Sequence, residues 1–194
     1  MAILRKNRPA VLKKCLPGLL YCLLGLAVFS RSAGAEARTE YQVKAVFLYN
    51  FSRFVEWPPQ TFSAPDEPFV IGVLGSDPFG TRLDEAVRGE QIDQHPLVVR
   101  RFRSLGEIGN CRILYIDRSQ SAEVPQILAA LDHHGTLTVS DLDGVSERGV
   151  MIQFTTENNR IRLRINVESA RAAGWTISSK LLRSADIVGT RGGS

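Results

Sequence analysis

The sequence predicts a three-layer α/β domain with a mixed, mostly parallel β-sheet. Short apolar runs alternate with amphipathic segments along most of the chain, which is typical of strands joined by crossover helices. Near the C-terminus two apolar runs are separated only by a short polar turn, which indicates a hairpin and therefore an antiparallel part of the sheet. Helices on both faces of such a sheet would cover its apolar sides.

The first 35 residues have the composition of a cleavable signal peptide. A basic start precedes a nearly continuous apolar run at 16–29, and Ala33-Gly34-Ala35 supplies the small residues of a cleavage site. The run is shorter than the roughly 20 residues that a membrane-spanning helix needs. We therefore expect an exported mature chain that begins at Glu36 and is not inserted into the membrane.

Removal of this leader reverses the sign of the net charge. The full chain has 24 Lys and Arg against 20 Asp and Glu, a net charge of +4. The leader holds six of the cations and none of the anions, so the mature chain has 18 cations against 20 anions, a net charge of −2. We therefore expect no nucleic-acid partner. The expected organisation is one domain at residues 36–188 and a flexible tail at 189–194.

The first element of the mature chain is expected to be an amphipathic helix over residues 39–57. Its apolar residues recur at mostly three- and four-residue spacing. Trp57 precedes a proline pair and should mark the turn away from the helix. Because apolar residues lie on more than one side, part of this helix should be buried on both sides or presented to a partner.

Strand and helix signals alternate in the middle of the chain. The expected strands cover residues 69–75, 97–102, 113–116 and 137–140. Asp77 can cap a helix whose first residue is Pro78, and a second helix should run from Ser121 to His134.

The last elements are expected to be a hairpin and two short helices. Residues 149–155 and 160–165 flank a turn at 156–159. In the second strand Arg160, Arg162 and Arg164 alternate with aliphatic residues, so this strand should be half exposed near a sheet edge. Asn166 and Ser178 can each cap a short helix.

The chain carries no recognisable catalytic constellation, so we expect neither an enzyme nor a cofactor. A G-x-S-x-G serine motif is absent, and Asp141 and Asp143 follow Ser140 in an ordinary turn. The glycines near residue 75 match neither a dinucleotide fingerprint nor a P-loop. The turn at Asp77 and Phe79 could still receive a small ligand, because it lies at the carboxyl end of a predicted strand.

Metal and disulfide chemistry are also not expected. The three histidines are poorly placed for a metal site, since His133 and His134 are adjacent in a predicted helix. The mature chain retains one cysteine, Cys111, at the start of a predicted strand. We expect it to be buried as a small apolar residue, and an intermolecular disulfide is the alternative.

Two places on the mature chain are expected to bind a partner. Trp175 lies near Arg171 in a predicted terminal helix, and an aromatic residue beside arginine is typical of interface hot spots. The alternative is a core tryptophan that holds the last two helices to the sheet. Arg53 and Trp57, at the end of the first helix, form the second place.

Four segments carry a resemblance to a known family. They are residues 41–58 (YQVKAVFLYNFSRFVEWP), 71–75 (IGVLG, followed by Phe79-Gly80), 111–116 (CRILYI), and Ile165-Asn166 with the later 173–182 (AGWTISSKLL). In this order they resemble the YfiR family of periplasmic regulators.

The resemblance implies an αβα sandwich in the periplasm, often a homodimer, that binds the periplasmic sensor domain of an inner-membrane diguanylate cyclase. Binding would hold the cyclase inactive and lower cyclic di-GMP, and an outer-membrane lipoprotein would relieve the repression. Relatives rely on paired cysteines, whereas Cys111 has no partner here, so redox control is not implied. A periplasmic small-molecule sensor or solute-binding module is the alternative function.

Overall fold

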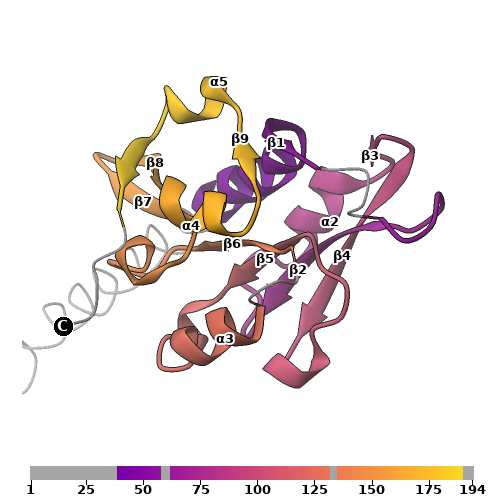
Figure 1. Cartoon of the computed structure of the whole chain (residues 1–194), viewed down its shortest axis with the longest axis horizontal. Helices are drawn as coiled ribbons and strands as arrows, with labels where there is room; N and C mark the ends of the chain where they lie inside the picture. The colour runs from indigo at the N-terminus through magenta and orange to yellow at the C-terminus, as the bar shows by residue number, and fades with distance from the viewer. Residues whose placement is uncertain (1–38, 58–61, 132–134, 190–194) are drawn as a thin grey trace, which may run out of the picture. The chain divides into compact units, whose positions relative to one another are not determined.

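A computed structural model describes residues 39–57, 62–131 and 135–189 (Figure 1). Within these residues the main feature is an eight-stranded sheet. In spatial order its strands are β10 (Asp186–Val188), β8 (Arg160–Asn166), β7 (Ile152–Glu157), β6 (Leu137–Ser140), β5 (Ile113–Ile116), β2 (Phe69–Leu74), β4 (His95–Phe102) and β3 (Gln91–Ile92). The pairs β7–β8 and β3–β4 are antiparallel and the others are parallel.

Helices cover both faces of the sheet. A helix over residues 39–54 and α2 (Thr81–Val87) pack on one face, and α3 (Val124–Leu131) packs on the other (Figure 1). The side chains of β2 alternate accordingly, with Ile71 in the first core and Val70 in the second. The predicted αβα sandwich with a mixed, mostly parallel sheet is therefore confirmed.

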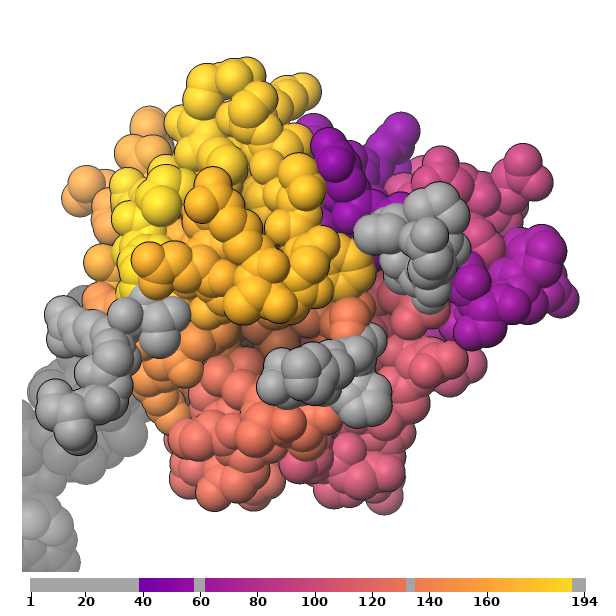
Figure 2. Space-filling model, viewed as in Figure 1, coloured from indigo at the N-terminus to yellow at the C-terminus, as the bar shows by residue number. Residues whose placement is uncertain are grey.

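A second, two-stranded sheet links the segment after the first helix to the C-terminal segment of the chain. Directly after the first helix, β1 (Val55–Glu56) pairs antiparallel with β9 (Thr176–Ile177). On either side of β9 lie α4 (Val167–Ala172) and α5 (Ser179–Leu182). Figure 2 shows the C-terminal segments, in yellow, packed directly against the N-terminal helix, in indigo.

Several predicted boundaries hold and two are corrected. Strands β5 and β6 have the predicted limits, and Asn166 and Ser178 cap α4 and α5 through their side chains. The first helix ends at residue 54, before Trp57, because the next two residues enter β1. The second predicted helix corresponds to α3, which begins at Val124 rather than at Ser121. Its predicted end at His134 lies outside the described residues.

The prediction that Asp77 caps a helix starting at Pro78 is wrong. Helix α2 begins at Thr81, with Gly80 at its N-cap and no side-chain capping bond. Asp77 instead accepts a hydrogen bond from the backbone N–H of Phe79 at 2.8 Å, which makes a tight turn. Gly80 then adopts φ 55°, a left-handed conformation that delays the start of the helix.

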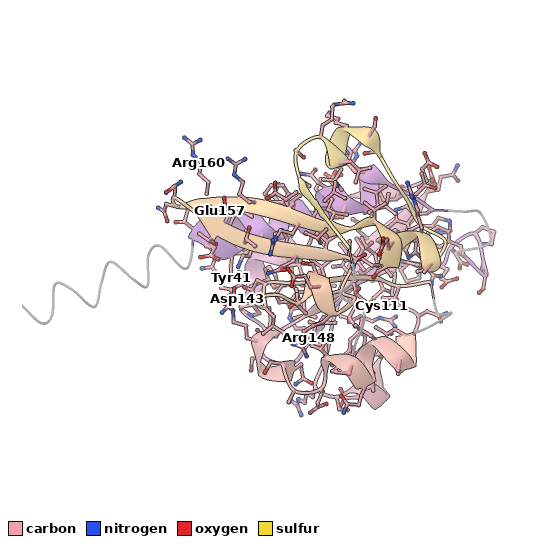
Figure 3. The ribbon with its side chains drawn as sticks, turned by 60° about the vertical axis from the view of Figure 1, so that its left-hand side comes forward. Tyr41, Cys111, Asp143, Arg148, Glu157 and Arg160 are labelled. Atoms are coloured by element: carbon pink, nitrogen blue, oxygen red, sulfur yellow. The ribbon has the colours of Figure 1, made fainter. Side chains whose placement is uncertain are left out.

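The predicted hairpin is present, but its first strand is shifted along the chain: β7 covers Ile152–Glu157, whereas residues 149–155 were expected. Strand β7 continues to Glu157, which pairs with Arg160, and Figure 3 shows both residues at the projecting end of the hairpin. The two turn residues, Asn158 and Asn159, both have positive φ, as a type I′ turn requires. The outer half of β8 is exposed on its arginine face, as predicted.

Cys111 is buried, as predicted, with 1% of its surface exposed. Burial raises the pKa of its thiol to about 12. A Cβ atom added at Gly72 would lie 2.7 Å from its sulfur, so the packing here is close. Among the described helices none is long and apolar enough to cross a membrane.

Candidate functional site

A groove of about 450 Å³ separates the end of the first helix from the β3–β4 hairpin. Two segments line it: one continues from the helix into β1, and the other is β3 with the turn that follows. Its lining residues are Ser52, Arg53, Val55, Glu56, Trp57, Gln91, Ile92 and Asp93. Both Arg53 and Trp57, predicted as partner-binding residues, are among them.

Arg53 is held at the wall of this groove by a chain of hydrogen bonds. Its Nη1 donates to the Tyr49 hydroxyl at 2.7 Å, one turn earlier in the helix. Tyr49 in turn donates to Oε2 of Glu90 at 2.6 Å, and this bond, followed by burial, raises the pKa of Tyr49. The chain links the helix to the segment before β3, so the guanidinium is exposed but oriented.

Trp57 is half-buried and fixed by three contacts. Its indole Nε1 donates to the backbone carbonyl of Ser52 at 2.7 Å. Its rings meet Phe69 and Trp175 edge to face, at centroid distances of 4.9 and 4.7 Å. Trp57 therefore offers a rigid aromatic surface to the groove, and little side-chain entropy remains to be lost on binding.

Trp175 lies in the core rather than on a free surface. Only 5% of it is exposed, and no described residue accepts a hydrogen bond from its indole Nε1. This burial agrees with the core alternative weighed from the sequence. Arg171, in the last turn of α4, is exposed and does not line the groove. The predicted pair of Trp175 and Arg171 thus presents only its arginine to solvent.

The turn at Asp77 and Phe79 is occupied by the protein's own side chains. Phe79 is completely buried between the rings of Tyr41 and Tyr115, at 5.5 and 4.8 Å. Oδ2 of Asp77 accepts a hydrogen bond from Nε of Arg101 at 2.7 Å. A ligand at this turn would have to displace Arg101.

A buried polar cluster lies at the carboxyl end of β6, and the sequence analysis did not identify it. Nζ of Lys44 is 2.6 Å from Oδ2 of Asp141 and 2.6 Å from Oε1 of Glu40. Arg118 donates from Nε to Oδ1 of Asp141 at 3.2 Å. The only sequence signal was a lysine directly between two apolar residues, Val43 and Ala45, of the first helix.

Burial and charge act in opposite directions on the pKa values of this cluster. Burial alone would raise the pKa of Asp141, but the hydrogen bond and charge of Lys44 outweigh it, and the pKa is lowered. Tyr41 donates to the same carboxylate at 2.9 Å, and burial followed by the Asp141 charge raises its pKa to about 12. The carboxylate is therefore the stable form, held by cations and a phenol.

This cluster does not activate a nucleophile. Ser140, next to Asp141, donates its hydroxyl proton to the backbone carbonyl of Ile116 at 2.7 Å. The Oδ1 and Oδ2 atoms of Asp141 already accept from Arg118, Lys44 and Tyr41. In the described part of the chain no group of three or more His, Cys, Asp or Glu could hold a metal ion.

Comparisons with known proteins identify a family. The sequence model of the family described as YfiR/HmsC-like matches residues 41–186. No curated protein matches. Among solved structures, the ABC domain in complex with L-Trp from Streptococcus pneumonia has a TM-score of 0.46 and 13% identity, over 62% of this chain and 55% of that chain. The family match spans both walls of the groove.

Proposed function

The chain belongs to the YfiR/HmsC-like family, and we propose that it is a periplasmic regulator that represses an inner-membrane diguanylate cyclase. It would bind the periplasmic sensor domain of the cyclase, hold the enzyme inactive and so lower cyclic di-GMP. The observation that carries the proposal is the family match over residues 41–186, nearly the whole described domain. Such a protein needs no reaction of its own.

The groove supplies the kind of surface that a protein partner uses. Trp and Arg are enriched among the residues that contribute most to binding energy at interfaces. Arg53 lies in the last turn of the helix and Trp57 directly follows β1, and each is fixed by a hydrogen bond to its own chain. Residues held in place before binding lose less entropy when the partner docks.

Repression and its release then follow from competing equilibria. An outer-membrane lipoprotein that binds the same regulator would draw it away from the cyclase, and each partner would reduce the apparent affinity for the other. A homodimer, as the family resemblance implies, would present two copies of each binding surface.

A pull-down from detergent-solubilised envelope tests the proposal. Cells express the full-length chain with an affinity tag, as wild type, as Arg53→Ala or as Trp57→Ala. We expect the wild type to recover a membrane diguanylate cyclase and both variants to recover at least about tenfold less, as for hot-spot residues. Cellular cyclic di-GMP should fall when the wild type is overproduced and fall less with either variant.

A control variant and a variant at a second predicted site sharpen the result. Arg103→Ala removes an exposed arginine in the loop after β4, away from the groove lining, and should leave recovery unchanged. Arg171→Ala tests the other predicted partner-binding residue. Loss of cyclase recovery with Arg171→Ala but not with Arg53→Ala would place the interface at α4. If overproduction of the wild type left cyclic di-GMP unchanged, that result would count against repression.

The volume of the groove also favours a second candidate, a small-molecule sensor. About 450 Å³ falls within the roughly 300–1,000 Å³ of typical ligand sites. A thermal-shift screen of metabolites would distinguish the two functions, because a ligand at 100 times its dissociation constant stabilises a protein by about 2.7 kcal/mol. A hit that Trp57→Ala abolishes, with no cyclase recovered, would favour the sensor.

A further inference from the structure

We infer that the groove binds an extended, basic segment of a partner protein, which pairs as an additional β-strand between β1 and β3. This rests on the proposed function only in that the partner is a protein. It adds the backbone conformation of the bound segment and the sign of its charge. Strand addition to exposed sheet edges is a general mode of peptide recognition.

The groove lies between two strands that each have a free edge. Strand β3 ends the eight-stranded sheet, and β1 has β9 as its one partner in the two-stranded sheet, within the residues that the structure describes. Residues of β1 line one wall of the groove and residues of β3 line the other. A strand inserted here would join the two sheets.

The backbone of Gln91 points away from β4. Ile92 pairs with His95 across the two-residue turn, so these two residues exchange the hydrogen bonds that close the hairpin. The next bonded position is Glu90, whose carbonyl accepts from the N–H of Leu97 at 3.0 Å. Gln91 lies between them, opposite Pro96, which has no N–H to donate. Its N–H and C=O are therefore directed to the outer edge of β3.

The ladder of β1 gives a matching result on the other wall. The N–H of Ser178 donates to the carbonyl of Phe54 at 2.9 Å, so the next pair, Val55 with Ile177, is a non-hydrogen-bonded pair. The carbonyl of Val55 is therefore directed away from β9. An inserted strand would find a backbone donor and acceptor on β3 and an acceptor on β1.

The charges around the groove favour a basic segment. Glu56 and Asp93 are exposed at its lining, whereas Arg53 is linked through Tyr49 to the carboxylate of Glu90. The lining thus has two carboxylates against one cation that already has an acidic neighbour. A lysine or arginine of the bound strand would also find the aromatic surface of Trp57, which suits a cation.

The test uses two fluorescent octapeptides, one alternating Val with Lys and one alternating Val with Glu. Their binding to protein purified from cells that express the full-length chain is measured by fluorescence anisotropy. We expect the Lys peptide to bind at least about tenfold more tightly than the Glu peptide, since like charges across an interface are costly. Absence of Lys-peptide binding, or equal affinities, would overturn the inference.

Variants at Gln91 separate backbone pairing from side-chain contact. Gln91→Pro removes the outward N–H, and we expect the Lys peptide to bind about fivefold less tightly, the factor that one net hydrogen bond supplies. Gln91→Ala keeps the N–H and should bind as the wild type does. Equal losses with the two variants would overturn strand pairing, provided that both unfold at the temperature of the wild type.

Asp93→Asn tests the charge without disturbing the turn. Asp93 has φ 48°, and asparagine is favoured at this position of a type I′ turn. We expect weaker binding of the Lys peptide and stronger binding of the Glu peptide. The peptide experiments are independent of the cyclase pull-down. The pull-down can therefore contradict cyclase repression while the peptides support strand addition, or the pull-down can support repression while the peptides contradict strand addition.

Discussion

Lys44 and Asp141 bring two opposite charges into the interior of the domain, 1% and 2% exposed, where either would be costly alone. They come from positions 97 residues apart, the first helix and the residue after β6. Helical periodicity places Lys44 among apolar residues, but it cannot indicate which distant carboxylate receives it. Burial of this kind depends on the assembled sheet, and so the sequence alone does not predict it.

Removal of Lys44 should strongly destabilise the domain. Lys44→Met keeps most of the side-chain volume but leaves the Asp141 carboxylate buried without its closest cation, and we expect a loss of about 3–5 kcal/mol in the free energy of unfolding. Urea unfolding followed by tryptophan fluorescence measures it. The double variant Lys44→Met, Asp141→Leu should recover most of this loss, because neither charge of this buried ion pair then remains. A loss in the double variant as large as in the single one would contradict the prediction.

Asp141 also makes stability depend on pH in acid. Its pKa is lower in the folded protein than in the unfolded chain, so its contribution is present above the unfolded value, about 3.9, and is lost as the pH falls through the folded value. Between about pH 6 and about pH 3 the wild type should therefore lose more stability than Asp141→Asn, which cannot titrate there. Parallel pH profiles of the two proteins would contradict this.

Elements with a strong apolar pattern were predicted well, and very short ones were not. Strands β5 and β6 were correct at both ends. β5 is a continuous apolar run, and in β6 Leu137 and Val139 alternate with Thr138 and Ser140, which is the period of a strand. Strands β1, β3, β9 and β10 have two or three residues each, too few for any periodicity to appear. Two of these short strands form the candidate groove, so its geometry could not be predicted from the sequence.

A substitution in the turn between β7 and β8 should stabilise the domain. Asn159 has φ 60°, and the second position of a type I′ turn favours glycine, which adopts positive φ without steric cost. We expect Asn159→Gly to raise the free energy of unfolding by about 0.5 kcal/mol, because relief of the left-handed strain, about 1–2 kcal/mol, exceeds the entropic cost of glycine, about 0.5–1 kcal/mol. Asn159→Ala, which has a Cβ but no polar side chain, should lower it. Differential scanning calorimetry of the three proteins distinguishes them, and a lower melting temperature for the glycine variant would refute this.

For the whole molecule, the sequence predicted the family and two of the eight residues that line the candidate groove, Arg53 and Trp57; their role in binding stays a prediction. The four resembling segments all lie within residues 41–186, where the family match is found. Arg53 and Trp57 were predicted together because they are four residues apart at the expected end of the first helix. The opposite wall, formed by β3 and its turn, meets them only after the chain has crossed β2 and α2. The sequence could not decide whether Trp175 is an interface residue or a core residue. Its burial depends on Trp57 and on the way the C-terminal segment returns to the first helix.

That return of the C-terminal segment should decide whether the domain folds at all. A chain that ends at Gly174 loses Trp175, Ile177 and Leu181, all buried in the core shared with the first helix. At about 1.5–3 kcal/mol for each buried side chain, the loss is comparable with the 5–15 kcal/mol that stabilises a typical domain. We therefore expect this truncated protein to lack a cooperative thermal transition in circular dichroism.

A shorter deletion gives the matched comparison. A chain that ends at Ala185 keeps the three buried residues and lacks β10, whose Asp186 and Ile187 are exposed. It should unfold cooperatively within a few degrees of the full-length protein, since exposed residues contribute little buried area. If it were unfolded as well, the edge pairing of β10 with β8, rather than the junction of β1 and β9, would be what the fold requires. If instead the chain ending at Gly174 unfolded cooperatively, the first helix would hold to the sheet without its C-terminal cover.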